Sequence, residues 1–563
     1  MKVVIIGGVA GGATAAARIR RLDEKAEIMV FEKSGFISYA NCGLPYYIGG
    51  TIENEVDLTL QTPQSFYSRF RVDMRVYHEV ISINPDSKTV TVKNLGTGEV
   101  FEESYDKLLI STGARPVKPP FDGIDSDRIF TLRTVEDTLK IKKYVTENKS
   151  KSAVIVGGGF IGIEVAENLH ELGMNVTLVE AAQQLMSPFD SDMAAFIHAE
   201  IRKNGINLML NTMVEGFADT ESGINVKLKD KDTLNADMVV MAIGVAPDTA
   251  LAKNAGLALG IKDSIVVNDR METSHLDIYA VGDAVQIKNF VTDSDTLISL
   301  AGPANKQGRI AADNICGGDS RYTGGQGSSV IKIFDLTAAS TGINERTAAQ
   351  SGLAFDKVIL SPMSHAGYYP GGKIMTMKVI FEKETYRILG AQIIGYDGVD
   401  KRIDVLAAAI RAGMKAYDLA ELDLAYAPPY SSAKDPVNMA GYIIENIKNG
   451  VVKQWYYEDV DNLINDGGVT LLDARTQTEY SRGHIEGFIN IPVDSLRERI
   501  GELDKNKPVY VMCQSGLRSY IASRILVGNG FDAYNFAGGF RFYDAVCNDK
   551  ALNKKSTPCG MDD

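Results

Sequence analysis

The sequence is poor in tryptophan, in cysteine and in positive charge. Its 563 residues include one Trp and five Cys, and the cysteines are scattered at positions 42, 316, 513, 547 and 559 without a Cys-x-x-Cys pair. An odd number of scattered thiols argues against a disulfide framework and against a zinc site. We therefore expect no metal, and free thiols that fit a reducing cytoplasm.

The charge balance also excludes classes of partner. Lys and Arg number 59 against 72 Asp and Glu, a net charge of −13, and no basic block stands out. Such a chain is an unlikely general nucleic-acid binder, and an anionic ligand would need a local basic pocket. No stretch approaches the ~18–20 consecutive apolar residues of a membrane span. Neither nucleic acid nor a membrane is expected as a partner.

Glycine, in contrast, is abundant, with 53 residues. Residues 2–6 and 152–156 are apolar strand patterns, and each precedes a glycine cluster and a helical pattern. Each unit then continues into a second apolar strand that ends in an acid, Glu32 or Glu180. Strand, glycine turn, helix and strand in this order are typical of a dinucleotide-binding unit, so the chain is predicted to contain two.

The second glycine turn is the more regular. Gly157, Gly159 and Gly162 spell G-x-G-x-x-G, with Phe160 and Ile161 opening the helix. Such glycines let the backbone approach a pyrophosphate at a helix N-terminus. Glu180 can accept hydrogen bonds from a ribose 2′-hydroxyl and would repel a 2′-phosphate, so NADH is favoured over NADPH. Gly244 follows a later strand of the same unit and is a further candidate contact.

The first glycine turn is irregular, because Val9 stands at the middle-glycine position and Gly11 is the glycine left to allow a close approach. Two later turns follow strands, and an acid in the second, Asp283, could bind a ribityl hydroxyl. The candidate contacts for this first nucleotide are Gly7, Gly8, Gly11, Gly12, Glu32, Lys33, Thr112, Gly113, Ala114 and Asp283.

A cysteine, Cys42, lies shortly after the first ribose acid in the segment SYANCGLPYY. These turns and this cysteine resemble the flavoprotein disulfide reductases with two dinucleotide domains, over residues 1–445. The resemblance implies FAD on the first unit, the nicotinamide cofactor on the second and a C-terminal dimerisation domain. Members of that family with two cysteines carry the second at +5, where this chain has Tyr47. Cys42 is therefore predicted to be a single redox thiol that pairs with substrate sulfur.

The segments SYANCGLPYYIGG and GGVAGGATAAARIRRLDE resemble the coenzyme A disulfide reductases and their persulfide-reducing relatives. Thr14, Arg18 and Arg21 share one face of the first helix, which is either a solvated charged face or a binding face for coenzyme A. The coenzyme A contacts that the resemblance implies are Thr14, Arg18, Arg21, Ser38, Asn41, Arg71, Asn305 and Lys434.

Two loops near the end of the dimerisation module carry tyrosines. Tyr368 and Tyr426 lie in loops that resemble those which, in this family, the second subunit lays over the cysteine of the first. By that resemblance their hydroxyls would donate to a sulfur anion, in a homodimer with shared active sites. Aromatic packing at a dimer interface is the alternative interpretation.

The C-terminal region contains LLDAR, GHIEGFINIP and a strand that ends in Cys513-Gln514-Ser515-Gly516-Leu517-Arg518. It resembles a rhodanese domain. A cysteine between a strand and a helix N-terminus lies in a cradle of backbone N–H groups that can hold a persulfide anion. The C-x₄-R spacing is one residue shorter than the C-x₅-R of tyrosine phosphatases and suits sulfur rather than phosphate. Cys316, Cys547 and Cys559 are interpreted as non-catalytic.

These observations predict an α/β protein of four modules. The expected ranges are 1–115 with 245–322 for a Rossmann-like FAD domain, 116–244 for a Rossmann-like NAD(H) domain, 323–446 for an α+β dimerisation domain, 447–457 for a linker, 458–550 for a rhodanese domain and 551–563 for a tail.

The predicted activity is NAD(P)H-dependent reduction of coenzyme A persulfide, polysulfide or coenzyme A disulfide through Cys42. Cys513 and Arg518 would accept or deliver sulfane sulfur. Coenzyme A could be a substrate or a tightly bound group. The alternatives are an NADH oxidase or peroxidase that uses a Cys42 sulfenic acid, and a redox or sulfur-carrier protein.

Overall fold

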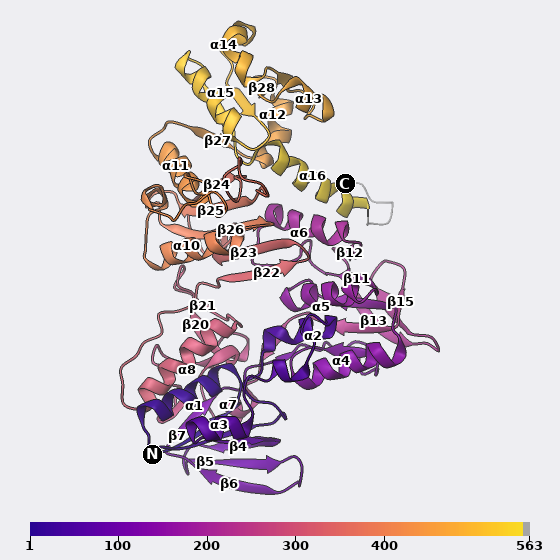
Figure 1. Ribbon diagram of the computed structural model, residues 1–563, viewed down its shortest axis with the longest axis vertical. Helices are drawn as coiled ribbons and strands as arrows, with labels where there is room; N and C mark the ends of the chain where they lie inside the picture. The colour runs from indigo at the N-terminus through magenta and orange to yellow at the C-terminus, as the bar shows by residue number, and fades with distance from the viewer. Residues whose placement is uncertain (556–563) are drawn as a thin grey trace. The chain divides into compact units, whose positions relative to one another are not determined.

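The computed structural model describes residues 1–555, and the chain forms two compact units (Figure 1). Unit 1 comprises Met1–Gln183 and Ile206–Gly327, and unit 2 comprises Gln184–Gly205 and the chain from Ser328 onward. Among residues 1–555, no helix combines the length and the apolar character that crossing a membrane requires.

Unit 1 begins with a five-stranded parallel sheet in the order β19-β7-β1-β2-β3. Its central strand β1 (Lys2–Ile6) is apolar and almost fully buried, as expected for a parallel strand covered on both faces. The other strands are β2 (Glu27–Glu32), β3 (Asp73–Val76), β7 (Lys107–Ile110) and β19 (Ile278–Ala280).

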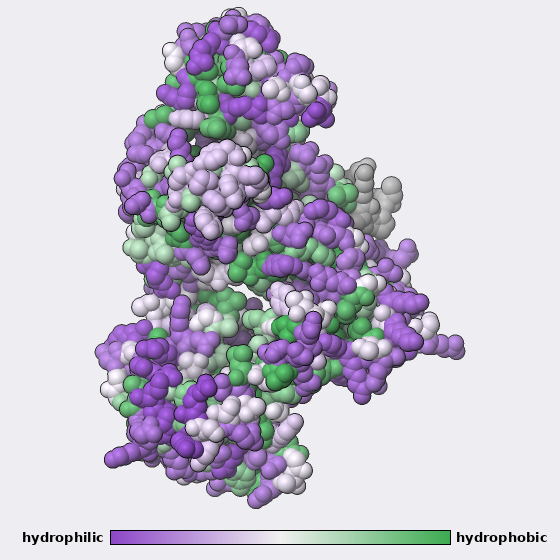
Figure 2. All heavy atoms as spheres, viewed as in Figure 1, coloured by the Kyte–Doolittle hydropathy of each residue, from purple (hydrophilic) through white to green (hydrophobic). Residues whose placement is uncertain are grey.

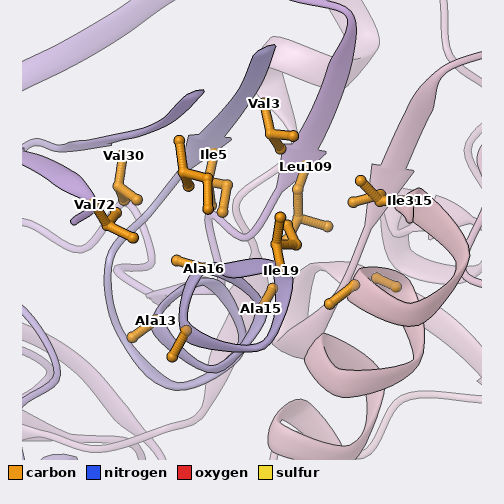
Figure 3. Close-up of a cluster of buried hydrophobic side chains, with 14 of the residues drawn as sticks. Val3, Ile5, Ala13, Ala15, Ala16, Ile19, Val30, Val72, Leu109 and Ile315 are labelled. Atoms are coloured by element: carbon orange, nitrogen blue, oxygen red, sulfur yellow. The ribbon is translucent and has the colours of Figure 1, made fainter. Parts of the chain in front are cut away.

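Helix α1 (Ala10–Leu22) connects β1 to β2 and packs on helix α8 (Ala301–Ile315). Its sequence is rich in alanine, the best helix former, and Arg20 and Arg21 lie in its last turn, where they complement the helix dipole. Figure 3 shows the side chains of β1 and α1 meeting between sheet and helix, with Ile315 of α8 beside them. This core fixes the N-terminus of α1 at the carboxyl end of β1.

The second sheet of unit 1 repeats this plan in the order β12-β11-β10-β16-β9, again with parallel strands. Helix α5 (Phe160–Glu171) follows β10 as α1 follows β1. The strands are β9 (Ile129–Thr131), β10 (Ser152–Val156), β11 (Asn175–Val179), β12 (Asn207–Met209) and β16 (Met238–Met241). The two dinucleotide-binding units predicted from the sequence are therefore confirmed as folds.

Short helices and small sheets complete unit 1. The helices are α2 (Leu44–Gly49), α3 (Pro63–Phe70), α4 (Val135–Asn148) and α7 (Ala250–Asn254). The antiparallel strands are β4 (His78–Asn84), β5 (Thr89–Asn94), β6 (Val100–Ser104), β8 (Ala114–Pro116) with β17 (Val245–Pro247), β13 (Val214–Asp219), β14 (Ile224–Leu228) and β15 (Leu234–Ala236). A last small sheet contains β18 (Ile265–Val266), β20 (Val285–Lys288) and β21 (Asp295–Thr296).

Unit 2 contains an antiparallel sheet in the order β22-β23-β26-β25-β24, the α+β module expected for dimerisation. Its strands are β22 (Ser329–Ile333), β23 (Leu336–Gly342), β24 (Phe355–Leu360), β25 (Thr376–Glu382) and β26 (Ile388–Gly395). Its helices are α9 (Glu345–Gln350), α10 (Val399–Arg411) and α11 (Pro436–Lys448). Helix α6 (Ser191–Lys203), which lies between β11 and β12 in the sequence, packs in this unit.

The C-terminal module is a parallel sheet in the order β27-β31-β30-β28-β29 with helices around it, the rhodanese-like α/β fold expected. The strands are β27 (Lys453–Trp455), β28 (Thr470–Asp473), β29 (Ile489–Asn490), β30 (Val509–Met512) and β31 (Ala533–Phe536). The helices are α12 (Val460–Asp466), α13 (Gln477–Arg482), α14 (Leu496–Arg499), α15 (Leu517–Gly528) and α16 (Gly539–Lys555).

The sequence interpretation differs from the structure at both ends of this module. Residues 447–457, expected as a linker, include β27, because Trp455 is buried and pairs along β31 as an edge strand. The tail expected from residue 551 begins as helix, since α16 continues to Lys555. The rest of that tail lies outside the described residues.

A buried ion network joins α6 to the antiparallel sheet within unit 2. The Lys378 side chain is 0% exposed, and its Nζ lies 2.6 Å from Asp192, 2.6 Å from Glu345 and 3.3 Å from Asp190. Glu345 also binds Lys357, which binds Glu458 at the start of the C-terminal module.

Hydrophilic residues predominate on the molecular surface that Figure 2 presents.

Lys378→Met should destabilise the protein, because it leaves carboxylates buried without their cation. Removing one partner of a buried ion pair costs about 3–5 kcal/mol, so the free energy of unfolding should fall by about that amount. Guanidinium unfolding measures it, and Lys383→Met, in the exposed turn that follows β25, is the matched control. Equal stability of the two variants would contradict a stabilising network.

Candidate functional site

The first glycine turn is fixed by backbone crowding. Gly7 has a φ of +97°, and a Cβ there would lie 2.2 Å from the carbonyl oxygen of Ser111. A Cβ on Gly12 would lie 1.9 Å from the carbonyl oxygen of Gly7. Only glycine permits both approaches, and together they hold the start of α1 against the turn. A Cβ on Gly11 would meet the side chains of Val281 and Ser111, so this glycine also lets α1 pack closely against those two residues.

The second turn shows the same two contacts and one difference. Gly157 has a φ of +110°, and a Cβ on Gly162 would lie 1.9 Å from its carbonyl oxygen. Gly159, the N-cap of α5, has no neighbouring atom within 4 Å of a built Cβ. Two glycines are therefore required by the fold, whereas the middle one faces open space at a helix N-terminus. That arrangement fits the pyrophosphate of a dinucleotide.

The two ribose acids are held in equivalent ways. Glu32 accepts hydrogen bonds from the N–H of Gly8, at 2.8 Å, and of Ser34, at 2.9 Å. Glu180 accepts from the N–H of Gly158, at 2.7 Å, and of Ala182, at 2.8 Å. Each carboxylate thus stands beside its glycine turn at the end of the second strand. The residues of both turns fit a dinucleotide.

The remaining candidate cofactor contacts surround these turns. Lys33 pairs with Asp248 at 3.2 Å, and the hydroxyl of Thr112 donates to the Asp248 carbonyl at 2.6 Å. Asp283 pairs with Arg133 at 2.7 Å, so a ribityl hydroxyl would share this carboxylate with a guanidinium. Gly113 and Gly244 have positive φ, Ala114 lies in β8, and Phe160 and Ile161 open α5.

Cys42 lies in a 3₁₀ turn, Asn41–Gly43, directly before α2, and it is exposed. Ser38, whose N–H donates to the Gly8 carbonyl at 2.9 Å, ties this segment to the first glycine turn. The structure therefore places the segment with Ser38, Asn41 and Cys42 beside the first glycine turn.

The surroundings of Cys42 raise the pKa of its thiol, chiefly through desolvation and then through the charge of Glu164, while Arg133 acts in the opposite direction. Glu164 accepts a hydrogen bond from the Tyr46 hydroxyl at 3.5 Å, and burial raises its pKa to about 7. Sequence reasoning missed Glu164, Arg133 and Tyr46. Glu164 carries no motif signal, because it approaches the thiol only through the packing of α2 against α5. Arg133, just before α4, is likewise distant from Cys42 in the sequence, whereas Tyr46 lies four residues after it.

Three of the candidate coenzyme A residues, Thr14, Arg18 and Asn305, lie along the seam between α1 and α8. The Thr14 hydroxyl donates to the Asn305 side chain, and Arg18 pairs with Asp313 at 2.7 Å. Arg21 is exposed, and Arg71 is exposed after α3 with its guanidinium over the Tyr67 ring. The predicted basic face thus exists, but its central cation already has an acidic partner.

The two tyrosine loops of unit 2 also lie together. The hydroxyls of Tyr368 and Tyr426 are 2.6 Å apart, and Tyr368 is 76% exposed. Lys434 is exposed at the end of the second loop. The pair is therefore presented outward.

One buried guanidinium, that of Arg402 on α10, supports both loops. Its Nη2 donates to the carbonyl of Ser364, before the first loop, at 2.9 Å and to that of Tyr430, in the second, at 3.3 Å. Asp435 balances its charge at 3.0 Å. Sequence reasoning also missed Arg402.

Cys513 is buried at the end of β30. The N–H of Gly516 lies 3.1 Å from its Sγ, and the hydroxyl of Ser519 lies 3.2 Å from it. Gly516 is the N-cap of α15, with a φ of +100°. The sulfur thus lies at a helix N-terminus with one backbone N–H and one hydroxyl beside it, and the Ser519 hydroxyl is a donor that the sequence reasoning did not single out.

Arg518 is held by a bidentate ion pair with Glu479, at 2.6 and 2.7 Å. Arg475 is paired in the same way with Asp473 of β28, at 2.7 Å. The other cysteines lie elsewhere, Cys316 at the end of α8 and Cys547 within α16, and Cys559 is outside the described residues.

Two nucleotide folds, a lone thiol beside the first turn and an antiparallel module define a class, the pyridine nucleotide-disulphide oxidoreductases. Residues 1–308 match the family model of that description, and residues 328–436 match its dimerisation domain. Residues 457–545 match the rhodanese-like domain. The first family implies FAD and NAD(P)H as cofactors, in agreement with the fit of the two turns.

Particular relatives narrow the class. The coenzyme A disulfide reductase of Staphylococcus aureus is 38% identical over 442 residues, 78% of this chain and 99% of that protein. The reduced CoADR-RHD of Bacillus anthracis is 47% identical with a TM-score of 0.95, covering 97% of this chain and 98% of that one. An NAD-dependent persulfide reductase from A. fulgidus is 38% identical with a TM-score of 0.90, covering 96% and 100%.

The chain belongs to the coenzyme A disulfide reductase and persulfide reductase family of flavoproteins, in the form that carries a C-terminal rhodanese domain.

Gly159→Ala and Gly162→Ala should separate binding from folding. The Gly159 variant places a methyl group in open space at the pyrophosphate position, so the Kd for NADH should rise about tenfold while the melting temperature stays unchanged. The Gly162 variant forces α5 away from its turn and should lose about 1–3 kcal/mol of stability. Titration calorimetry and thermal unfolding measure the two effects. A matched loss of stability in both variants would contradict the assignment.

Glu164→Gln should lower the pKa of Cys42, because an ionised carboxylate disfavours the nearby thiolate. Iodoacetamide alkylation of Cys42, followed against pH, should be faster in the variant above a pH of about 7, because the pKa of its thiol is lower than in the wild type. The two profiles should converge at lower pH, where Glu164 is protonated. Glu171→Gln, an exposed position on the same helix, is the control and should leave the profile in place.

Proposed function

We propose that this protein is an NAD(P)H-dependent flavoprotein that reduces coenzyme A persulfide, polysulfide or coenzyme A disulfide through Cys42, and that Cys513 accepts or delivers sulfane sulfur. The observation that carries this proposal is the pair of lone thiols, one beside the first nucleotide turn and one in a cradle of donors. The names of the Staphylococcus aureus and A. fulgidus relatives support the substrate class.

The chemistry at Cys42 follows from its having no cysteine at +5. Its thiolate would attack one sulfur of the substrate S–S bond, form a mixed disulfide and release the other sulfur as a thiolate or as hydrosulfide. Two electrons would then regenerate the Cys42 thiolate and release the bound group. FAD bound at the first unit would supply these electrons from NAD(P)H.

Residues of the chain would bind the coenzyme A portion. Arg18, Thr14 and Asn305 lie at one seam, and an incoming phosphate would compete with Asp313 for the Arg18 guanidinium. Ser38 and Asn41 would line the path to Cys42, and Arg21 and Arg71 would contribute charge at its outer end. Lys434 would add a further positive charge from the loop of a second subunit. Coenzyme A would serve either as a substrate or as a tightly bound group. The rhodanese module favours the persulfide as substrate.

The tyrosine pair would act across a homodimer. The exposed hydroxyls of Tyr368 and Tyr426 would donate to a sulfur anion at the Cys42 of a second subunit. The dimerisation module supports the homodimer. Glu180 at the second ribose position supports NADH over NADPH, and the free thiols among the described residues support a reducing compartment such as the cytoplasm.

An oxidase or peroxidase that uses a Cys42 sulfenic acid would share this flavin site, and a sulfur carrier would share the Cys513 cradle. NADH consumption with oxygen alone, compared with anaerobic consumption with coenzyme A persulfide, separates the first alternative. Slow turnover of every small sulfur compound, with capture of a partner protein at Cys513, would indicate the second.

Cys42→Ser should abolish NADH-dependent reduction of coenzyme A persulfide, because the serine oxygen cannot form and release the mixed disulfide. Anaerobic oxidation of NADH, followed by the absorbance of the reduced nicotinamide, measures this activity. Cys316→Ser is the matched control. Persistent turnover in the Cys42 variant would refute the mechanism.

Cys513→Ser should spare small persulfides and lower turnover of polysulfide by about tenfold or more, since only the second class needs a thiol relay. The same NADH assay with each donor measures the split. Cys547→Ser controls for loss of a thiol in the same module. An equal loss with both donors would mean that Cys513 has no separate role.

A further inference from the structure

The charged groups around Cys513 are already paired with one another. Glu479 binds both Nη atoms of Arg518 and also accepts from the backbone N–H of Thr476, at 3.0 Å, and from its hydroxyl, at 2.8 Å. The bond from Arg518 lowers the pKa of Glu479 to about 2, so its carboxylate remains charged at any physiological pH. Because Thr476 anchors Glu479 at the start of α13, the Arg518 guanidinium is held in this pair.

The second guanidinium of the loop region is paired as well. Arg475 is 2% exposed, and its Nε and Nη2 bind the carboxylate of Asp473. Its Nη2 also donates to the carbonyl of Gly483, and only Nη1 reaches the catalytic loop, at the Gln514 side chain, 3.4 Å away. Each of these two guanidinium groups therefore has its charge balanced by a carboxylate.

The rim of the loop adds no charge. Gln514, Ser515, Gly516 and Leu517 separate Cys513 from Arg518, and none of the four is ionisable. Leu517 is 60% exposed at the first position of α15, so the residue beside Arg518 presents an apolar side chain to solvent. What remains for an anion are the Gly516 N–H, the Ser519 hydroxyl and the partial positive charge of the helix N-terminus.

We propose that the Glu479–Arg518 pair and Leu517 set the donor specificity of the Cys513 site, so that it takes sulfur from organic persulfides or polysulfides and discriminates against thiosulfate. This deepens, and rests on, the sulfur-accepting role proposed for Cys513. The Cys513 thiolate attacks the terminal sulfur of R–S–S⁻, a new S–S bond forms on the cysteine, the donor S–S bond breaks and its electron pair leaves as R–S⁻.

The physical reason is the charge of the donor and of the leaving group. An organic persulfide brings one negative charge to the cradle and leaves as a monoanionic thiolate. Thiosulfate brings two and leaves as dianionic sulfite, and two charges need cations that a neutral cradle does not provide. An uncommitted guanidinium would supply such a cation.

The test compares sulfur transfer to cyanide from glutathione persulfide and from thiosulfate, using the full chain. The wild type should favour the persulfide in kcat/KM by at least about tenfold. Glu479→Gln, which releases Arg518, and Leu517→Lys, which adds a cation at the rim, should each raise kcat/KM for thiosulfate about tenfold, mainly through KM. Persulfide transfer should change by less than about threefold.

Matched controls isolate the site. Glu486→Gln removes one negative charge at an exposed position of the same module and should leave both donors unchanged. If both designed variants leave thiosulfate transfer unchanged while folding as the wild type does, or if the wild type uses thiosulfate as well as the persulfide, the specificity proposal is wrong. Cys513→Ser distinguishes this from failure of the proposed function, because sulfur transfer that persists in that variant means that Cys513 is not the acceptor at all.

Discussion

The structure depends on the contact between a helix and the glycine turn that precedes it. In both nucleotide units a glycine of the helix, Gly12 or Gly162, lies so close to the carbonyl of the turn glycine that a Cβ would stand 1.9 Å from it. This approach places the helix N-terminus over the carboxyl end of the central strand. The ribose acid, the cofactor position and the Cys42 segment are all located relative to that end.

Acid–base pairing is the second organising feature of this acidic chain. Arg18 at the seam of α1 and α8, Arg133 near Cys42 and Arg518 in the Cys513 loop each have a carboxylate partner, at 2.6–2.7 Å. An anionic ligand must therefore exchange with a carboxylate or rely on backbone donors. The sequence shows the net charge of −13, but the local balance at each thiol comes from these pairs. The two thiols thus occupy different electrostatic surroundings, which supports separate roles in one sulfur pathway.

Much of the fold could be predicted because its signals are local. The turns at Gly7 and Gly157, the strand-terminal acids and the Cys513–Arg518 loop each occupy one short stretch of chain, where spacing reports geometry directly. The boundaries of the C-terminal module were less accessible. Strand β27 has only three residues, and its burial depends on pairing with the distant strand β31, where Lys453 lies opposite Tyr534. Glu164 and Glu479 carry no motif of their own, so their proximity to a thiol could not be seen in the sequence.

The sequence by itself determined the two nucleotide folds, the rhodanese-like module and the identity of the two lone thiols, because backbone constraints at glycine and the absence of a cysteine at position 47 are properties of adjacent residues. Only the tertiary structure decided which charges face those thiols and which groups hold the loops. Arg402 supports both tyrosine loops, and Glu479 neutralises Arg518 from 39 residues away. Such pairings are set by the packing of distant segments, which brings a carboxylate and a guanidinium within hydrogen-bond distance of each other.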